Sequence, residues 1–573
     1  MSCLFFASGT LSRKILVVYI QGIFLFIFYA ITSELMESWD NQNLGALLDP
    51  FGINTNGHVT RYWTVAEQNS QTVGLTGLVL WNRLLWVGIA LVALLFTFWK
   101  FNFNLISGKG KKVKKAEVTR GSSDVIAAAV EIPKVTQYSG FGTSLEQITN
   151  LAGFYFKWLT NQYTFLALVI GGILFTAAGF FFGLGGMYDV DVYPSTYRVL
   201  GLLSDFNIFF FIITVLYSGE LIWKERDVKI NLIYDAMPYT NYVSLIGKFL
   251  ALILVFVVML FALGLVGITA QTMMGFTNYE LPVYFKSLFI DDLSNWVLFA
   301  FLGFFMHTMV NHKFIGHSMM VVFFVGTLVL SQLGWEHNML NFASGSLGRY
   351  SDMNGFGHYF QPFNWFSSYW LGFALVLFTM VLFFTVRGAE TALKTRFKLG
   401  RLRWNKGMAI LALMSLFLFG GAGAYIYYNT NILNEYQNSD DTNADQAEYE
   451  KSLKKYEGEP LLKIVGTYVE VDVFPENRDF VAKGNYILKN KSDQPIDKLY
   501  LQLRSEKEIQ SKVEFNVPVE VEEQWDKFKF TIYNLVSPIA PGDSIKMDFV
   551  TNYSTVGFVE SGSNTEVLHN GTF

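Results

Sequence analysis

The sequence predicts a polytopic α-helical membrane domain followed by an antiparallel β-sandwich domain. Of its 573 residues, 52% are hydrophobic, 17% are aromatic and only 16% are charged, and the mean hydropathy is +0.31. These values are far from those of soluble globular proteins. Long apolar runs recur up to residue 428 and then stop, and shorter runs with a two-residue alternation follow. The composition therefore excludes a purely soluble protein and places one soluble domain after the membrane helices.

About nine apolar runs are long enough to cross the hydrocarbon core of a bilayer as helices, which takes about 20 residues. We expect these spans at 15–32, 84–99, 165–184, 208–223, 249–270, 293–310, 314–333, 370–386 and 408–428. The runs 208–223 and 293–310 are close to the lower limit of length, so the span count depends most on them.

Basic residues gather in every second connecting segment. The basic segments are 13–14, 100–157, 224–248, the turn at Lys313 and 387–406. Because loops rich in lysine and arginine stay in the cytoplasm, the N-terminus is predicted to be cytoplasmic. An odd number of spans then places the segment after residue 428 on the opposite side of the membrane.

The tail, 429–573, is predicted to be a separate soluble domain. It is acidic and contains no further apolar run of spanning length. A polar helical pattern at 445–456 predicts a stalk within 429–460. Beyond residue 460, apolar residues alternate with charged ones, as in 469–473, and turn residues separate these runs. This pattern is typical of half-buried strands in an antiparallel β-sandwich.

A charged, amphipathic insert at 219–238 separates two long apolar runs. Apolar and aromatic residues at 230, 233 and 234 follow the charges at helical spacing, which predicts a helix that lies on the membrane face and contacts a partner. The candidate contact residues are Lys224, Glu225, Arg226, Asp227, Lys229, Asp235 and Pro238. The alternative is an ordinary basic loop beside a span. Two more charges lie at span ends: Glu220, which we expect to pair with Lys224 one turn later, and Lys248.

An internal repeat divides the membrane domain. The segments 49–52 and 86–92 resemble 354–357 and 370–376 in sequence and order, although apolar sequence also matches by chance. With the repeat, the chain begins within a first copy and contains one complete six-span unit. The predicted domains are the last two spans of a first repeat (1–100), a basic cytoplasmic linker (101–150), the six-span unit (151–388), a basic loop with the final span (389–428), the stalk (429–460) and the β-domain (461–573).

Three short motifs accompany the six-span unit: Glu225-Arg226-Asp227, 235–238 and Gly247-Lys248. With them, the unit resembles the permease subunit of ABC-2 type exporters. In that family the loop after the second span forms a coupling helix that contacts the ATPase, and the resemblance implies this role for the insert. The chain has no P-loop motif, so ATP hydrolysis is expected from a separate subunit.

A second set of motifs lies in the β-domain. It consists of 473–476, 483–486, Leu488, Asn490, 495–496, 540–543, 557–558 and 570–573. With these motifs the tail resembles the N-terminal β-domain of M1-family zinc aminopeptidases, and the whole chain is similar to bacterial fusions of such a permease with an M1 peptidase. The HExxH motif, which places two zinc-binding histidines on one helix face, is absent. We therefore expect no peptidase activity and no zinc or other cofactor in this chain, unless a catalytic domain follows Phe573.

Other candidate sites have weaker support. His307, His312 and His317 surround a predicted turn, and their spacing of five residues scatters them around a helix, so we expect packing roles and no metal. The basic run at 108–112 lacks the spacing and the preceding strand of a P-loop. We interpret it as a linker attracted to anionic lipid, with nucleic-acid binding as the weaker alternative.

The sequence thus predicts the membrane permease component of an ABC-2 type exporter in the bacterial inner membrane, with a periplasmic M1-like β-domain. Its expected partners are the lipid bilayer, a separate ABC ATPase subunit and a second membrane subunit in a homodimer or heterodimer. Two alternatives stay open. One is a membrane-anchored M1 zinc aminopeptidase whose catalytic domain lies beyond this chain, and the other is a non-transporting membrane scaffold or sensor.

Overall fold

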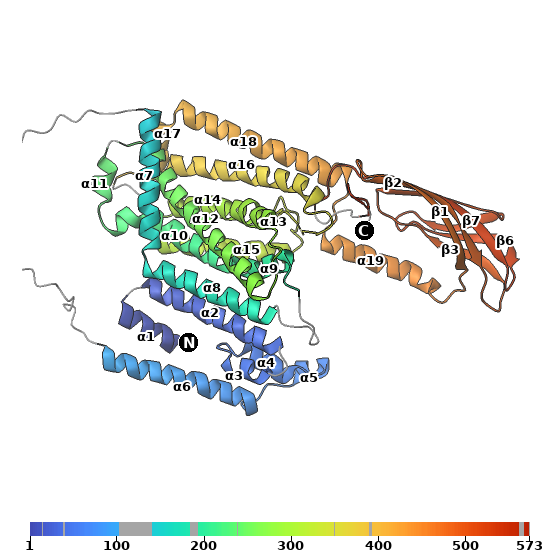
Figure 1. Ribbon diagram of the computed structural model, residues 1–573, viewed down its shortest axis with the longest axis horizontal. Helices are drawn as coiled ribbons and strands as arrows, with labels where there is room; N and C mark the ends of the chain where they lie inside the picture. Colours follow the sequence, from blue (N-terminus) through green and yellow to red (C-terminus); the bar gives the residue numbers. More distant parts are fainter. Residues whose placement is uncertain are drawn as a thin grey trace, which may run out of the picture. The chain divides into compact units, whose positions relative to one another are not determined.

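The structure is a computed structural model that forms two compact units. It describes residues 1–13, 15–37, 41–101, 140–183, 193–237, 239–348, 350–388, 392–560 and 566–571. The first unit comprises Met1–Ile213 and Tyr242–Tyr279, and the second comprises Thr214–Asn241 and Glu280–Phe573. Figure 1 labels the α-helices and most of the strands.

The first unit begins with two long apolar helices joined by a group of short ones. Asp49 organises this group, because its carboxylate accepts a hydrogen bond from the Asn54 backbone N–H at 2.6 Å at the start of a short helix. The fully buried Asn82 donates its side-chain amide to the carbonyls of Ala46 and Asp49 at 3.1 and 2.8 Å. These bonds satisfy backbone groups where helices end. The helices are α1 (Ser2–Ser12), α2 (Ile15–Glu37), α3 (Gln42–Leu48), α4 (Ile53–Thr60), α5 (Val65–Ser70) and α6 (Gly77–Lys100).

A sharp bend follows in the same unit. α7 (Phe141–Thr160) and α8 (Tyr163–Gly183) are bent by 69° at the break between them, and Figure 1 shows α7 lying across the direction of α8. Within the break, Thr164 donates a hydrogen bond to the side-chain oxygen of Gln162 at 3.3 Å. α7 buries one face and exposes large apolar residues such as Phe141 and Phe154 on another. Such a pattern is typical of a helix at a membrane surface.

The position of α7 differs from the predicted linker at 101–150. Residues 141–150 are helical, whereas 102–139 lie outside the described residues. The sequence did not indicate where α7 begins, because its apolar residues are spaced along one face and form no continuous run. An added Cβ at Gly247 would lie 2.8 Å from the Leu151 side chain, so this glycine allows α12 to approach α7 closely. The remaining elements are α9 (Thr196–Leu203), the 3₁₀ turn η1 (Ser204–Phe206), the start of α10 (Asn207–Asp227) and most of α12 (Asn241–Met273).

In the second unit, the helices α16 and α18 pack closely against each other. An added Cβ at Gly372 of α16 would lie 2.5 Å from the backbone nitrogen of Phe419 in α18, so a glycine is required at this crossing. The helical elements after the first unit are α11 (Asn231–Ala236), α13 (Leu281–Phe285), the π-turn η2 (Lys286–Asp292), α14 (Leu293–Met309), α15 (Lys313–Gln332), η3 (Gly357–Tyr359), α16 (Phe360–Phe384), α17 (Leu393–Arg403), α18 (Lys406–Tyr427) and η4 (Tyr428–Leu433).

Seven helices in the described part of the chain are long and apolar enough to cross a membrane. They are Gly77–Lys100, Thr196–Asp227, Asn241–Met273, Leu281–Met309, Lys313–Gln332, Phe360–Phe384 and Lys406–Leu433, and the bent α7–α8 pair makes an eighth if it is one span. The chain is therefore a multi-pass membrane protein. The two short predicted runs fall in helices of 32 and 29 residues, and only Val310 lies beyond the end of the second helix. The predicted span 15–32 falls in α2, and the exact number of nine spans stays a prediction.

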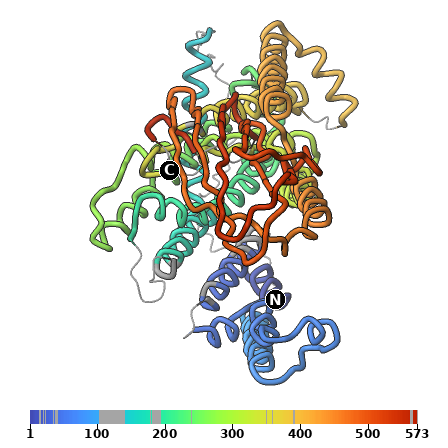
Figure 2. The backbone as a smooth tube through the Cα atoms, turned by 90° about the vertical axis from the view of Figure 1, so that its right-hand side faces the viewer, coloured from blue at the N-terminus to red at the C-terminus, as the bar shows by residue number. Residues whose placement is uncertain are grey.

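The tail forms an antiparallel two-sheet domain, as the alternating pattern predicted. One sheet has the strand order β1-β2-β7-β4 and the other β3-β6-β5, and Figure 2 shows these strands in orange and red. Leu499, Leu535, Ile539 and Ile545 form the core between the sheets. The strands are β1 (Lys463–Phe474), β2 (Asp479–Lys489), β3 (Ile496–Gln502), β4 (Ile509–Phe515), β5 (Val519–Trp525), β6 (Phe530–Ile539) and β7 (Ser544–Tyr553).

The helix predicted as a stalk packs against this domain. α19 (Ser439–Leu453) and the turn η5 (Lys454–Tyr456) carry the buried Leu453, which shares a second core with Phe530 and Ile532. Tyr449 contacts Phe528 edge-on, with ring centroids 5.4 Å apart. α19 is therefore part of the β-domain, although its polar sequence suggested a free connection.

Ile532→Ala should destabilise the β-domain by about 2–5 kcal/mol, because it removes buried methyl groups and leaves a cavity between sheet and helix. Ile532 is 1% exposed, whereas Val536 on the same strand is 60% exposed, so Val536→Ala is the matched control. Brief proteolysis of the detergent-solubilised protein in rising urea measures both. Equal urea midpoints for the two variants would contradict this packing.

Candidate functional site: the charged insert

The insert is formed by the end of one membrane helix and a short second helix. α10 continues to Asp227, so the predicted contact residues from Lys224 to Asp227 lie in its last turns. Lys229 then adopts a left-handed backbone conformation with a φ of 58°, and α11 follows after one residue. The predicted single helix is therefore two helices with a turn between them. Pro238 lies outside the described residues.

The exposed surface of the insert is apolar. We call Val228, Ile230, Leu232, Ile233 and Met237 the insert surface, because each is a large apolar side chain exposed on this segment. Ile233 is 73% exposed, whereas Glu225, which the sequence placed in the contact helix, is only 8% exposed. Grouped exposed apolar side chains mark contact sites for a protein or a membrane. The insert thus exposes apolar residues and buries part of its predicted charge signature.

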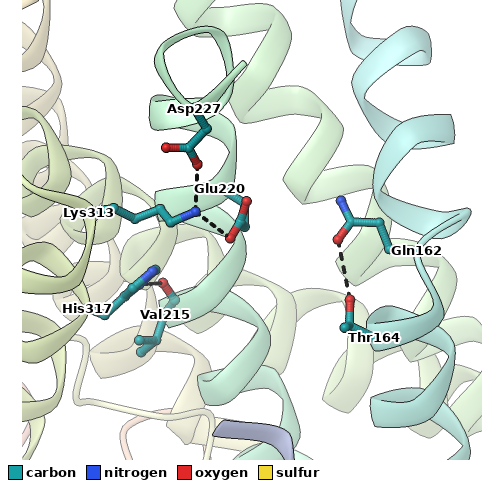
Figure 3. Close-up of polar contacts among 7 residues, drawn as sticks. All are labelled: Gln162, Thr164, Val215, Glu220, Asp227, Lys313 and His317. Atoms are coloured by element: carbon teal, nitrogen blue, oxygen red, sulfur yellow. Dashed lines mark hydrogen bonds and ion pairs between the residues drawn. The ribbon is translucent and has the colours of Figure 1, made fainter. Parts of the chain in front are cut away.

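Lys313 holds the beginning of the insert. Its Nζ lies 2.9 Å from Glu220 Oε1 and 2.6 Å from Asp227 Oδ2, as Figure 3 shows. Lys313 is the first residue of α15, where the helix dipole disfavours a positive charge, and the two carboxylates offset this cost. The sequence predicted Lys224 as the partner of Glu220. The ion pair in the structure instead joins two different helices.

Arg387, just after α16, holds the end of the insert. Its guanidinium donates to the carbonyl oxygens of Asp235 (2.7 Å), Met237 (2.5 Å) and Tyr239 (3.1 Å) and to the side-chain oxygen of Asn241 (3.3 Å). The Asp235 carboxylate accepts a further hydrogen bond from the Gly388 N–H at 2.8 Å. Burial raises the pKa of Tyr239, and the charge of Arg387, 4.9 Å from the ring centroid, opposes that shift. The predicted residue Asp235 therefore anchors the insert.

A histidine pair packs against α10 just before the Lys313 anchor. The rings of His307 and His317 are 4.8 Å apart, and His317 Nδ1–H donates to the Val215 carbonyl at 2.9 Å (Figure 3). Added Cβ atoms at Gly219 and Gly316 would lie 2.4 and 2.2 Å from these rings. The packing role was predicted, but its geometric reason was wrong, because the two histidines lie on α14 and α15 and meet across a turn.

Arginines of α17 satisfy the ends of the helices around the insert. Arg396 is buried, and its guanidinium donates to the carbonyls of Phe384 and Thr308 at the ends of α16 and α14. Burial lowers the pKa of Arg396 to about 10, and nearby Arg226 contributes, so the side chain stays charged at neutral pH. Arg403 donates to the Thr385 carbonyl at 2.6 Å. The predicted basic loop is thus a helix that closes the bundle.

The remaining predicted site residue, Lys248, belongs to the first unit. It is buried, and its Nζ lies 5.4 Å from the centroid of the Tyr155 ring. Sequence reasoning missed Lys313 and Arg387 as anchors. A local signal existed for both, since each is the first basic residue beside a long apolar run. Nothing in the sequence indicated which segment they bind.

Within the described part of the chain, no group of three or more histidine, cysteine, aspartate or glutamate residues is arranged to hold a metal ion. Comparisons with models of protein families, with curated proteins and with solved structures return no match. The functional argument therefore rests on the geometry of this chain.

Arg387→Ala should speed amide hydrogen exchange across residues 228–241 by about tenfold or more, because hydrogen bonds from a charged donor contribute about 1.5–3 kcal/mol. Arg401→Ala is the matched control, since the exposed Arg401 lies over the Phe397 ring of α17 and contacts none of the insert carbonyls named above. Hydrogen exchange followed by mass spectrometry measures the segment directly. Equal protection in both variants would show that Arg387 does not fix the insert.

Lys313→Met should lower stability by about 1–3 kcal/mol, because it leaves the mostly buried Glu220 without its cation. Lys313→Met/Glu220→Gln should recover most of the loss, since the mostly buried carboxylate is then gone and only the partly exposed Asp227 lacks the lysine. Thermal unfolding in a nonionic detergent compares the two variants. A double variant no more stable than the single one would rule out a stabilising ion pair.

Proposed function

We propose that the chain is the membrane permease component of an ABC-2 type exporter, that it carries an extracytoplasmic M1-peptidase-like β-domain, and that a separate subunit hydrolyses ATP. The observation that carries the proposal is the insert, an exposed apolar segment fixed at both ends to membrane helices. A loop that only connected two spans would not need this support. The motif resemblance assigns the same segment to ATPase contact.

The anchors provide a physical route from a partner to the membrane helices. Lys313 connects the start of the insert to α15, and Arg387 connects its end to the segment just after α16. A rigid-body movement of the insert therefore shifts both helices together. Closure of an ATPase pair against the insert surface would rock the bundle between inward-facing and outward-facing states, which is an established type of transition.

The β-domain has no catalytic task in this proposal. The chain lacks the HExxH motif, so zinc chemistry of the M1 type is not assigned to these residues. α19 packs against a sheet of this domain through an apolar core. The domain acts as a folded module outside the cytoplasm that follows the last membrane helix.

Ile233→Asp should abolish ATP hydrolysis that co-purifies with the tagged protein from its own membranes, because a buried unpaired carboxylate disfavours the contact strongly. Met353→Asp is the control, since Met353 is also a large exposed apolar residue but lies outside the insert. The ATPase activity and the amount of a co-purified subunit with a P-loop motif are both measured.

The two readouts separate the possible results. Loss of the P-loop subunit and of ATPase activity only with Ile233→Asp supports the proposal. Absence of any P-loop subunit from the native complex contradicts it, and so does a complex that keeps full activity with Ile233→Asp.

A further inference from the structure

The first strand of the β-domain is a long, open sheet edge. β1 has 12 residues and pairs with β2 on one side, and among the described residues no strand pairs with its other side. The edge strands β3, β4 and β5 have only seven residues each. Short edge strands are one way in which proteins avoid pairing with other chains. β1 lacks this protection and also lacks proline and lysine after Lys463.

One face of β1 carries an apolar row. Val469, Val471 and Val473 lie opposite Gly484, Ala482 and Phe480 of β2, so all six share one face of the sheet. Each of the three valines is exposed, and Val471 is 52% exposed. We call these three valines the valine row.

The valine row lies on the same sheet face as a cavity between the two sheets. The cavity has a volume of about 450 Å³, and its lining includes Phe480, Tyr486, Phe549 and Leu501. The rings of Tyr486 and Phe549 are stacked, with centroids 4.8 Å apart. The apolar face therefore continues from the sheet interior to the open edge.

The other face of β1 is acidic. Glu470 and Asp472 alternate with the valine row, and both are exposed. Lys483 of β2 is opposite Glu470, and the Tyr468 hydroxyl donates to Glu470, whereas Val481 is opposite Asp472. The charge of Asp472 is therefore less neutralised by its cross-strand neighbour than that of Glu470, and it is more available to an incoming chain. Charge complementarity favours a strand with basic residues on this face.

A second copy of β1 fits this edge poorly. An antiparallel pair that aligns the two valine rows about Val471 places Glu470 of one copy opposite Asp472 of the other. Like charges directly opposite each other destabilise paired strands. The acidic face thus disfavours pairing with a second copy of β1 and favours pairing with a basic strand.

We propose that β1 is a docking edge for an extended peptide segment in which apolar and basic residues alternate. The backbone of the segment pairs with the open side of β1, as in other cases of strand addition. Its apolar side chains lie beside the valine row, and its basic side chains face Glu470 and Asp472. This inference does not depend on the proposed transport function.

The test uses the full chain in a nonionic detergent and a fluorescent eight-residue peptide that alternates lysine and valine. Fluorescence anisotropy should show saturable binding of this peptide and none of a peptide with four lysines followed by four valines. Val471→Lys should weaken binding by about tenfold or more, because it places a charge in the valine row. Val521→Lys is the matched control, since Val521 is exposed on the edge strand β5 of the other sheet.

Asp472→Lys should reverse the preference, so that a peptide alternating glutamate and valine binds instead. The proposal is overturned if the alternating lysine–valine peptide does not bind, if the block peptide binds equally well, or if Val471→Lys leaves the affinity unchanged. Disulfide-linked dimers of Val471→Cys in a Cys3→Ser background would also overturn it, because they would show that a second copy occupies the edge.

Discussion

The C-terminal end of every helix leaves backbone carbonyls that need hydrogen-bond donors, and the architecture of this protein depends on how they are satisfied. In hydrocarbon each unsatisfied group costs several kcal/mol. Asn82 supplies donors to carbonyls at the end of α3, and Arg396 supplies them to the ends of α14 and α16. Arg387 does the same for the insert. These long-range polar contacts satisfy the ends of α3, α11, α14 and α16.

The sequence predicted the elements that local composition controls. Long apolar runs gave the membrane helices, and the alternation around Val469–Val473 gave the antiparallel sheets. α7 was missed because its apolar residues occupy only one face, so a search for continuous runs passed over it. The polar surface of α19 likewise concealed the few residues, such as Leu453, that bind it to the sheet.

The geometry of the insert could not be predicted from local spacing. The charge motif lies in the last turns of α10, yet Lys313 and Arg387 are separated from their partners by 93 and about 150 residues. Such contacts arise from the packing of whole helices and leave no periodic trace in the sequence. Local spacing favoured Lys224 as the partner of Glu220, and tertiary structure supplied Lys313. The exposed surface also shifted, from the charges around Glu225 to the apolar residues after them.

The two anchors of the insert differ in their physical nature, and this difference determines how they respond to their surroundings. The Lys313 anchor is an ion pair, and its Asp227 side is partly exposed, so dissolved salt weakens it. The Arg387 anchor joins a cation mostly to neutral carbonyls, whose geometry matters more than long-range charge. Loss of the first therefore frees the junction with α10 while the second keeps α11 in place. For the proposed partner, the insert surface would then have one salt-sensitive end and one fixed end, and the fixed end leads to α16.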